Sequence, residues 1–120
     1  MNSLKLSVII PIHNADRLLS SCLESIRNQS FSDYEVLCID DNSTDNSSEI
    51  IKNFASTDAR FKYLKINERS ASKARNYGMD IAQGEFITFV DADDFVEQNA
   101  FEYLLSSIET NAGTGSRRYT

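Results

Sequence analysis

The sequence is poor in the residues that build zinc centres, redox motifs and glycine-rich phosphate loops. Its 120 residues include one histidine, two cysteines, four glycines, one proline and no tryptophan. Cys22 and Cys38 form no CxxC pair and have no histidine pair nearby, so neither a zinc site nor a redox-active dithiol is indicated. The chain also has no GxGxxG or Walker A sequence, which argues against dinucleotide-fold and P-loop chemistry. We expect both cysteines to be reduced thiols in the core.

The sequence also lacks an excess of positive charge. Eighteen Asp and Glu residues against twelve Lys and Arg residues give a net charge of -6. This is the wrong sign for a protein whose affinity comes from neutralising a phosphate backbone, so we expect no nucleic-acid partner. An acidic chain can still bind a nucleotide where a divalent cation bridges its carboxylates to the phosphates. The positions of the acids therefore matter more than their number.

Long hydrophobic runs are missing as well. The apolar stretch near the N-terminus is interrupted by Pro11, and it is too short for a secretory signal or for the ~20 residues that span a bilayer. We therefore expect no transmembrane segment and a cytoplasmic protein, with attachment to the inner face of the membrane as a variant of that location. The length allows one domain with one modest core.

Four short apolar runs alternate with segments of helical periodicity. The runs cover 6–12, 34–39, 61–66 and 86–90, and the helical segments lie near 18–26, 50–54, 72–82 and 98–108. This order predicts an α/β fold: a doubly wound, mostly parallel sheet with helices on both faces. Asp16 is the expected N-cap of the first helix, and Gly84 the expected left-handed residue behind the third. We expect residues 1–110 to form the domain and 111–120 a disordered or non-native tail.

Polar residues follow the predicted strands at their carboxyl ends, where ligands bind in open α/β sheets. They are Pro11, His13 and Asn14 after the first strand, Asp40, Asp41 and Asn42 after the second, and Asp91, Asp93 and Asp94 after the fourth. Because the strands are expected to be parallel, these groups should meet at one edge and share one crevice.

Asp91, Asp93 and Asp94 would repel one another unless a cation or hydrogen-bond donors compensate them. With only hard oxygen ligands close by, the ion would be Mg²⁺ or Mn²⁺ holding the phosphates of a substrate. The alternative is that these aspartates cap the next helix and lie in water, because acids are favoured near helix N-termini.

The other polar positions also have two interpretations. Asp40 and Asp41 can hold a ribose or base by accepting hydrogen bonds, or they can simply form a turn. Arg75 can offset phosphate charge, whereas Lys73 is better explained as part of a solvated helix face. His13 has no carboxylate or nucleophile in sequence reach, so we interpret it as a packing or backbone-bonding residue.

Three stretches, "SVIIPIHN", "CIDDNSTDNS" and "SKARNYGMDIAQGEFITFVDADD", resemble the nucleotide-sugar-binding half of family 2 inverting glycosyltransferases with the GT-A fold. The resemblance covers about Ser7 to Ser107. It implies a nucleotide-diphosphate sugar donor, Mg²⁺ or Mn²⁺ on the departing diphosphate, a saccharide or lipid-linked acceptor, and a role in polysaccharide biosynthesis.

The resemblance also implies roles for individual residues. Pro11 and Asp41 would lie around the donor base, with Asp40 close by. Asp93 would ligate the metal, and Asp91 would contact the ribose or the metal shell. The Ala-Arg-Asn element of the family falls on Arg75 and Asn76, which would lie alongside the nucleotide.

The chain departs from the family in two respects. The family's general base on the acceptor has no counterpart here, and the glycine-rich turn before the Ala-Arg-Asn element is replaced by "NERSAS". We therefore expect the N-terminal part of a longer glycosyltransferase, with little or no activity in isolation. The alternative is an inactive structural module that associates with itself. Phosphoryl transfer of the haloacid-dehalogenase or response-regulator type needs an acid behind the first strand, which instead ends in "PIHN".

Overall fold

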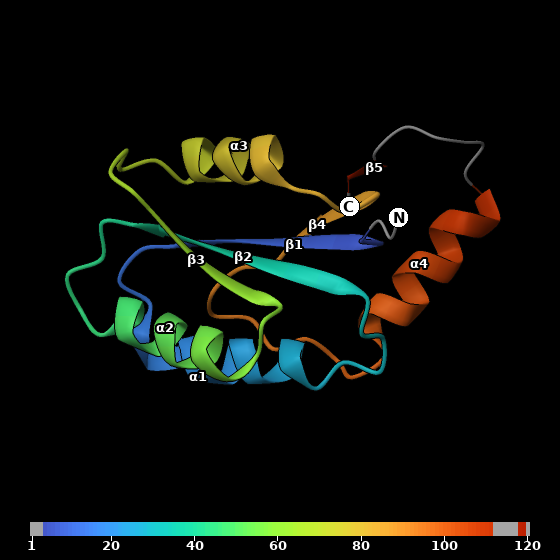
Figure 1. The fold of residues 1–120 in the computed structure, drawn as a ribbon, viewed down its shortest axis with the longest axis horizontal. Helices are drawn as coiled ribbons and strands as arrows, with labels where there is room; N and C mark the ends of the chain where they lie inside the picture. The colour runs from blue at the N-terminus through green and yellow to red at the C-terminus, as the bar shows by residue number, and fades with distance from the viewer. Residues whose placement is uncertain (1–3, 112–117, 120) are drawn as a thin grey trace.

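The computed structural model describes residues 4–111 and 118–119. Strands and helices alternate along the chain (Figure 1). In order they are β1 (Leu6–Ile12), α1 (Asp16–Arg27), β2 (Tyr34–Asp41), α2 (Ser47–Thr57), β3 (Phe61–Ile66), α3 (Ala71–Ile81), β4 (Phe86–Phe89), α4 (Ala100–Asn111) and β5 (Arg118–Tyr119). In this part of the chain no helix combines the length and the apolar character that a membrane crossing requires.

The five strands form one sheet in the order β3-β2-β1-β4-β5. Every neighbouring pair is parallel. Helices α1 and α2 lie on one face of the sheet and α3 on the other, while α4 lies beyond the end of the sheet (Figure 1). The α/β fold predicted from the sequence, with a parallel sheet covered on both faces, is confirmed.

The core has two layers because side chains along a strand alternate between the faces of the sheet. Leu6, Val8 and Ile10 of β1 pack on the side of α1 and α2, and Ile9 packs with residues of α3 on the other side. All four are fully buried. The central position of β1, between β2 and β4, explains why it reads as an almost continuous apolar run.

Two glycines allow close contacts with β1. A Cβ on Gly78 of α3 would lie 2.6 Å from Cγ2 of Ile9, and a Cβ on Gly84 would lie 2.6 Å from the backbone of Leu6 and Ser7. The prediction that Gly84 is a left-handed residue is wrong, because the C-cap of α3, Ala82, has an extended backbone and the φ of Gly84 lies outside the left-handed region. A glycine is needed at position 84 because β1 leaves no room for a Cβ. The N–H of Gly84 also donates to Ser7 Oγ at 2.8 Å.

The helix starts differ in part from those expected. Asp16 is the first residue of α1, with Ala15 at the N-cap and no side-chain cap hydrogen bond, so the prediction that Asp16 caps the helix is wrong. The N–H of Ala15 instead donates to Oγ of Ser47, the first residue of α2, at 2.9 Å, so a neighbouring helix satisfies this end of α1. At α3, Ser70 is a regular N-cap and accepts from the N–H of Lys73.

The predicted tail, 111–120, falls largely outside the described residues. Within it the structure describes the end of α4 and the short strand β5, which pairs with Phe86 and Ile87 of β4. The prediction of a disordered or non-native tail stays a prediction.

Candidate functional site

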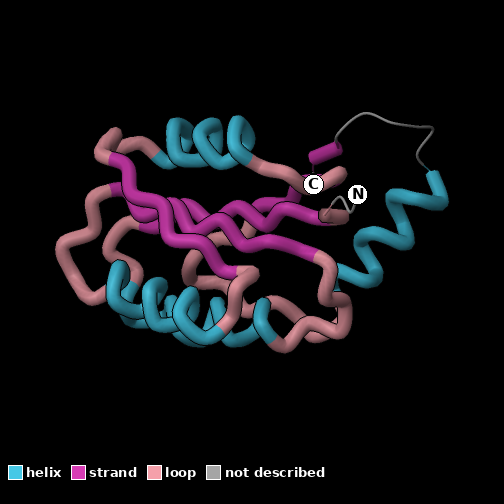
Figure 2. Tube along the Cα trace, viewed as in Figure 1, coloured by secondary structure: helices cyan, strands magenta, loops and turns pink. Residues whose placement is uncertain are grey.

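The loops behind β1 and β2 lie at the same end of the sheet (Figure 2), and hydrogen bonds join them. Asn14 Oδ1 accepts from the backbone N–H groups of Thr44 at 2.7 Å and Asp45 at 3.2 Å. In return, the N–H of Asn14 donates to Ser43 Oγ at 3.0 Å. The polar residues of "DNSTDNSS" therefore do more than form a turn, because they fix the position of the preceding strand–helix connection.

Three residues at this end of the sheet have a left-handed backbone. Asn14, Asn42 and Arg69 have φ values of 50°, 58° and 54°. Asparagine tolerates this conformation well, whereas it is uncommon for arginine. The left-handed conformation of Arg69 therefore has to be held by hydrogen bonds to this segment of the backbone. Asp41 accepts these bonds.

Asp41, the last residue of β2, organises the segment before α3. Its Oδ1 accepts from the N–H groups of Glu68 at 2.8 Å and Arg69 at 3.0 Å, and its Oδ2 accepts from that of Ser70 at 2.8 Å. The residue is only 4% exposed. Burial by itself raises the pKa of Asp41, but the three N–H donors outweigh it and hold the pKa of this carboxyl below its usual value. The group is therefore ionised at neutral pH.

Asp40 points in a different direction and has other partners. Its Oδ2 accepts from the Tyr63 hydroxyl at 2.7 Å, and its Oδ1 accepts from the N–H of Ser43 at 3.1 Å. Burial and this hydrogen bond to Asp40 raise the pKa of Tyr63 to about 12, so the phenol stays protonated and keeps donating. Asp40 is 1% exposed, and it supports the site from below the surface.

A cleft of about 630 Å³ opens above these residues. Its walls are the end of β1 and the residues after it, the end of β2 and the residues after it, and the start of α3 with the two residues before it. They comprise Pro11, Ile12, His13, Asn14, Asp41, Asn42, Thr44, Arg69, Ser70, Ala71 and Ala74. Nδ1 of His13 lies 2.8 Å from the carbonyl oxygen of Asp41 and so carries the proton that it donates. This agrees with the interpretation of His13 as a backbone-bonding residue.

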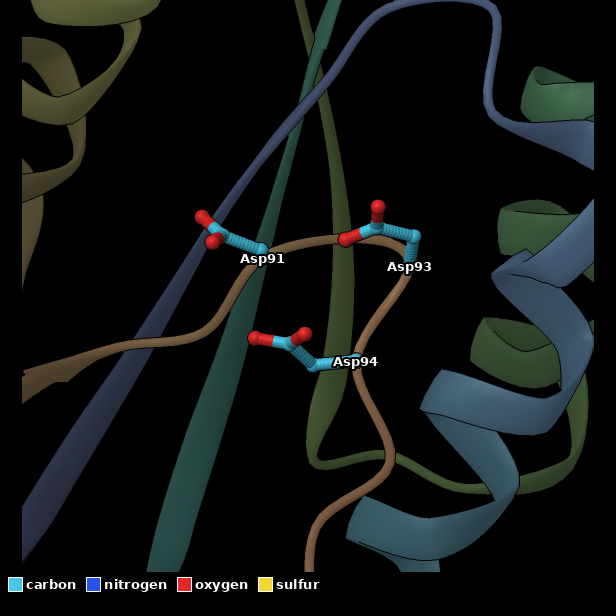
Figure 3. Close-up of side chains that lie close together, drawn as sticks. All are labelled: Asp91, Asp93 and Asp94. Carbon is cyan, nitrogen blue, oxygen red and sulfur yellow. The ribbon is translucent and has the colours of Figure 1, made fainter.

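The acid triad, Asp91, Asp93 and Asp94, lies on the loop behind β4. One carboxylate oxygen from each residue lies within 4.8 Å of the others, and all three residues are exposed. Figure 3 shows the carboxylates of Asp93 and Asp94 pointing toward the side on which Asp91 lies, and the carboxylate of Asp91 pointing the same way, away from the other two. The N–H of Asp94 donates to the carbonyl oxygen of Asp91 at 3.0 Å, which closes the loop into a turn. In the part of the chain that the structure describes, this is the only group of three or more such residues that could hold a metal ion.

The triad lies beside a buried thiol of α1. Sγ of Cys22 donates to the carbonyl oxygen of Asp91 at 3.4 Å. Burial, and then the negative charges of Asp94 and Asp93, raise the pKa of Cys22 to about 12. The thiol is therefore neutral and serves as a hydrogen-bond donor below the acidic loop.

The strand register relates the triad to the cleft. The last paired residues of β1 and β4 are Ile9 and Phe89, and the N–H of Val90 still donates to the carbonyl oxygen of Ile9 at 3.1 Å. Two residues further along the chain from Ile9 and Phe89 are Pro11, in the wall of the cleft, and Asp91, the first residue of the triad. The two features therefore lie at the same edge of the sheet on neighbouring strands.

The structure separates the predicted site residues into four groups. Pro11 and Asp41 line the cleft, Asp91 and Asp93 belong to the triad, and Asp40 lies beneath. Arg75 and Asn76 lie on α3, half-buried and exposed respectively, and the cleft walls do not include them.

Sequence reasoning missed part of the cleft wall. The apolar side contains Ala71 and Ala74 of α3, and Thr44 lies opposite in the loop after β2. The signal that could have indicated Ala74 is its small side chain on the buried face of α3, whereas Ala71 carries no such signal. His13 and Asn14, which the sequence places behind the first strand and in the shared crevice, do line the cleft, and so does Arg69 in the segment before α3.

With this geometry established, comparison with known proteins shows the family. Residues 7–119 match the description "Glycosyl transferase family 2", and the chain belongs to this family of glycosyltransferases. A Campylobacter jejuni protein named GalNAc(5)-diNAcBac-PP-undecaprenol beta-1,3-glucosyltransferase is 41% identical over 103 residues, which are 84% of this chain and 33% of that protein.

Solved structures support the GT-A type of fold. The structure of S. aureus TarS 1-349 in complex with UDP-GlcNAc matches with a TM-score of 0.82 and 30% identity, over 88% of this chain and 31% of that one. A Pyrobaculum calidifontis mannosyltransferase in complex with GDP-Man and Mn²⁺ matches with a TM-score of 0.75 over 94% of this chain and 34% of its own. At 24% identity this second likeness concerns the fold alone. The chain spans 15% to 45% of the length of the curated relatives compared.

Proposed function

We propose that this chain binds a nucleoside diphosphate sugar, with the base and ribose in the cleft and the diphosphate at the acid triad through Mg²⁺ or Mn²⁺. The observation that carries the proposal is the position of the cleft and the triad at one edge of the sheet, on neighbouring strands. The likeness to TarS, whose structure contains UDP-GlcNAc, supports a donor of this class.

The cleft offers both surfaces that a nucleoside needs. Pro11, Ala71 and Ala74 provide apolar contact, and Asp41 provides an acceptor. A carboxylate has about four lone-pair positions, and three are used by the N–H groups of residues 68–70. One position on Oδ2 is left for a ring N–H or a ribose hydroxyl, and the lowered pKa keeps this oxygen an acceptor.

The acid triad has the donor chemistry of a Mg²⁺ or Mn²⁺ site. Its ligand atoms are all carboxylate oxygens, within 4.8 Å of one another. An octahedral Mg²⁺ ion with bonds of about 2.1 Å places its ligand oxygens roughly 3 to 4 Å apart, so small side-chain rotations bring the triad to that spacing. A bound ion supplies positive charge to the diphosphate as it leaves the sugar. Asp93 and Asp91 would hold it, with Arg75 and Asn76 alongside the nucleotide.

We further propose that this chain is the N-terminal part of a longer protein, which transfers the sugar to a saccharide or lipid-linked acceptor with inversion. The name of the Campylobacter jejuni relative includes an undecaprenol-linked acceptor, which supports this class. The general base and the acceptor site would lie outside the segment shared with the relatives. A place in polysaccharide biosynthesis and a cytoplasmic location belong to the same proposal.

Calorimetry with UDP and GDP, with and without Mn²⁺, tests the binding proposal. We expect binding that requires the metal and is lost in Asp93→Ala. Asp33→Ala is the matched control, because Asp33 is an exposed acid in the loop before β2 and its loss also removes one negative charge. Nucleotide binding that is absent, independent of Mn²⁺ or equal in Asp93→Ala and the wild type would overturn the proposal.

A further inference from the structure

The acid triad lies on a loop that has to hold like charges together. Residues 90–99 between β4 and α4 contain no helix or strand. The triad carboxylates are within 4.8 Å of one another, and they repel when ionised. A Mg²⁺-type ion needs its ligand oxygens near fixed positions. Contacts from outside the loop must therefore oppose the repulsion.

Those contacts come from α1 and the residues directly behind it. Cys22, Ser25 and Gln29 follow one another at spacings of three and four residues, which places them on one side of the helix. The Cys22 thiol bonds to the carbonyl oxygen of Asp91. Further along, Ser25 Oγ accepts from the N–H of Val96 at 3.0 Å.

Gln29 makes the largest number of bonds to the segment behind the triad. Its Nε2 donates to the carbonyl oxygens of Glu97 at 2.5 Å and Val96 at 3.4 Å. Its Oε1 accepts from the N–H of Phe101 at 3.0 Å. Phe101 is the second residue of α4, and its N–H is one of the groups that a helix start leaves without a partner inside the helix. Gln29 therefore fixes the end of the loop and the start of the next helix.

This role explains why a polar residue occupies a buried position. Gln29 is 8% exposed and Ser25 is 5% exposed, and burying such groups is unfavourable unless they are hydrogen-bonded. Within the described residues no buried side-chain nitrogen or oxygen lacks a partner. An amide offers two donors and an acceptor in one plane, whereas a carboxylate at neutral pH offers only acceptors.

We propose that Gln29, together with Ser25, is a positioning residue for the acid triad and sets its affinity for a divalent cation. The proposal rests on the function proposed above for the triad. Val96 and Glu97 follow Asp94 by two and three residues, and Asp94 is bonded to Asp91. A shift of the held segment is thus transmitted to all three carboxylates. Neither residue touches the ion or the nucleotide.

The test compares Mn²⁺ affinity in the wild type, Gln29→Glu and Ser25→Ala. Gln29→Glu keeps an acceptor for Phe101 but removes the donors to Val96 and Glu97. Ser25→Ala removes only the acceptor for the N–H of Val96 and covers the case in which the first variant fails to fold. Asn28→Ala is the control, because the exposed Asn28 side chain bonds to Glu24 on its own helix.

Electron paramagnetic resonance of free Mn²⁺, measured with UDP present, gives the affinity, and near-ultraviolet circular dichroism confirms folding. Loss of a residue that orients metal ligands lowers metal affinity about 10- to 100-fold, and we expect Gln29→Glu in this range, Ser25→Ala weaker than the wild type, and Asn28→Ala unchanged. The proposal is overturned if Gln29→Glu folds and binds Mn²⁺ with wild-type affinity, even if its melting temperature is lower. If Gln29→Glu does not fold, wild-type Mn²⁺ affinity in Ser25→Ala overturns the proposal. A wild-type chain that binds no Mn²⁺ overturns the proposed function as well.

Discussion

Replacing Asp41 with asparagine tests whether this buried carboxylate holds the base side of the site together. The wild-type carboxylate accepts from three backbone N–H groups. Asparagine keeps one oxygen, which can serve Glu68 and Arg69, but it presents an amide NH₂ to the N–H of Ser70. One buried donor loses its partner and the other two bonds lose their charge. Together these losses cost about 2 to 4 kcal/mol of unfolding free energy.

The pH dependence distinguishes this explanation from a simple packing defect. The pKa of Asp41 is lowered in the folded chain, and an unfolded Asp has a pKa of about 3.9. A carboxyl whose pKa is lower in the folded chain than in the unfolded chain stabilises the fold. This stabilisation is fully present above the pKa of the unfolded chain, and it is lost as the pH falls through the pKa of the folded chain. Asparagine does not titrate. The stability gap between the wild type and Asp41→Asn should therefore be constant at neutral pH and narrow below about pH 4.

Urea unfolding of both proteins at pH 7 and at pH 3, followed by circular dichroism, provides the measurement. Asp33→Asn is the control for removing one acid: Asp33 is exposed, and a surface change of this kind alters stability by less than about 0.5 kcal/mol. The reasoning is refuted if Asp41→Asn is as stable as this control at pH 7, or if the gap has the same size at both pH values.

Two further predictions concern the core. Gly84→Ala should lower the unfolding free energy by about 1 to 3 kcal/mol, because the new methyl meets the backbone of β1. Gly78→Ala should cost less, since its methyl meets the side chain of Ile9, which can shift; equal costs in urea unfolding would contradict this. Cys22 and Cys38 should not react with a disulfide reagent at pH 8 in the folded chain, because burial raises the pKa of both thiols, to about 12 for Cys22. Both should react in denaturant, and rapid labelling of the folded chain would contradict the prediction.

The positions of the elements were predictable because apolar periodicity reports burial directly. The run 6–12 became β1 and the run 61–66 became β3 with the same bounds. The second strand extends two residues further than predicted, to Asp41. An aspartate behind an apolar run predicts a turn, but in the structure Asp41 still pairs with Ile66 of β3. The apolar pattern therefore predicts where the strands lie, whereas pairing with the neighbouring strand determines where β2 ends.

The roles of the two acids behind β2 could not be predicted, because their partners are distant in the sequence. Asp40 is bonded to Tyr63, 23 residues away, and Asp41 to the N–H groups of Glu68, Arg69 and Ser70, 27 to 29 residues away. As a sequence, "DDNS" offers two equivalent carboxylates. In the fold, Asp40 lies beneath the surface and Asp41 lies in the wall of the cleft.

Helix α1 is bonded both to the loop behind β2 and to the loop behind β4. At its start, the N–H of Asp16 donates to Asp45 Oδ2 at 3.1 Å in the loop behind β2. Behind its end, Gln29 holds the loop behind β4. A helix of 12 residues is a rod of about 18 Å, so the loop behind β2 and the segment that follows the acid triad are attached near opposite ends of one rigid element. A substitution in the buried face of α1 should therefore weaken nucleotide and metal binding together, although no residue of that face lines the cleft as described here.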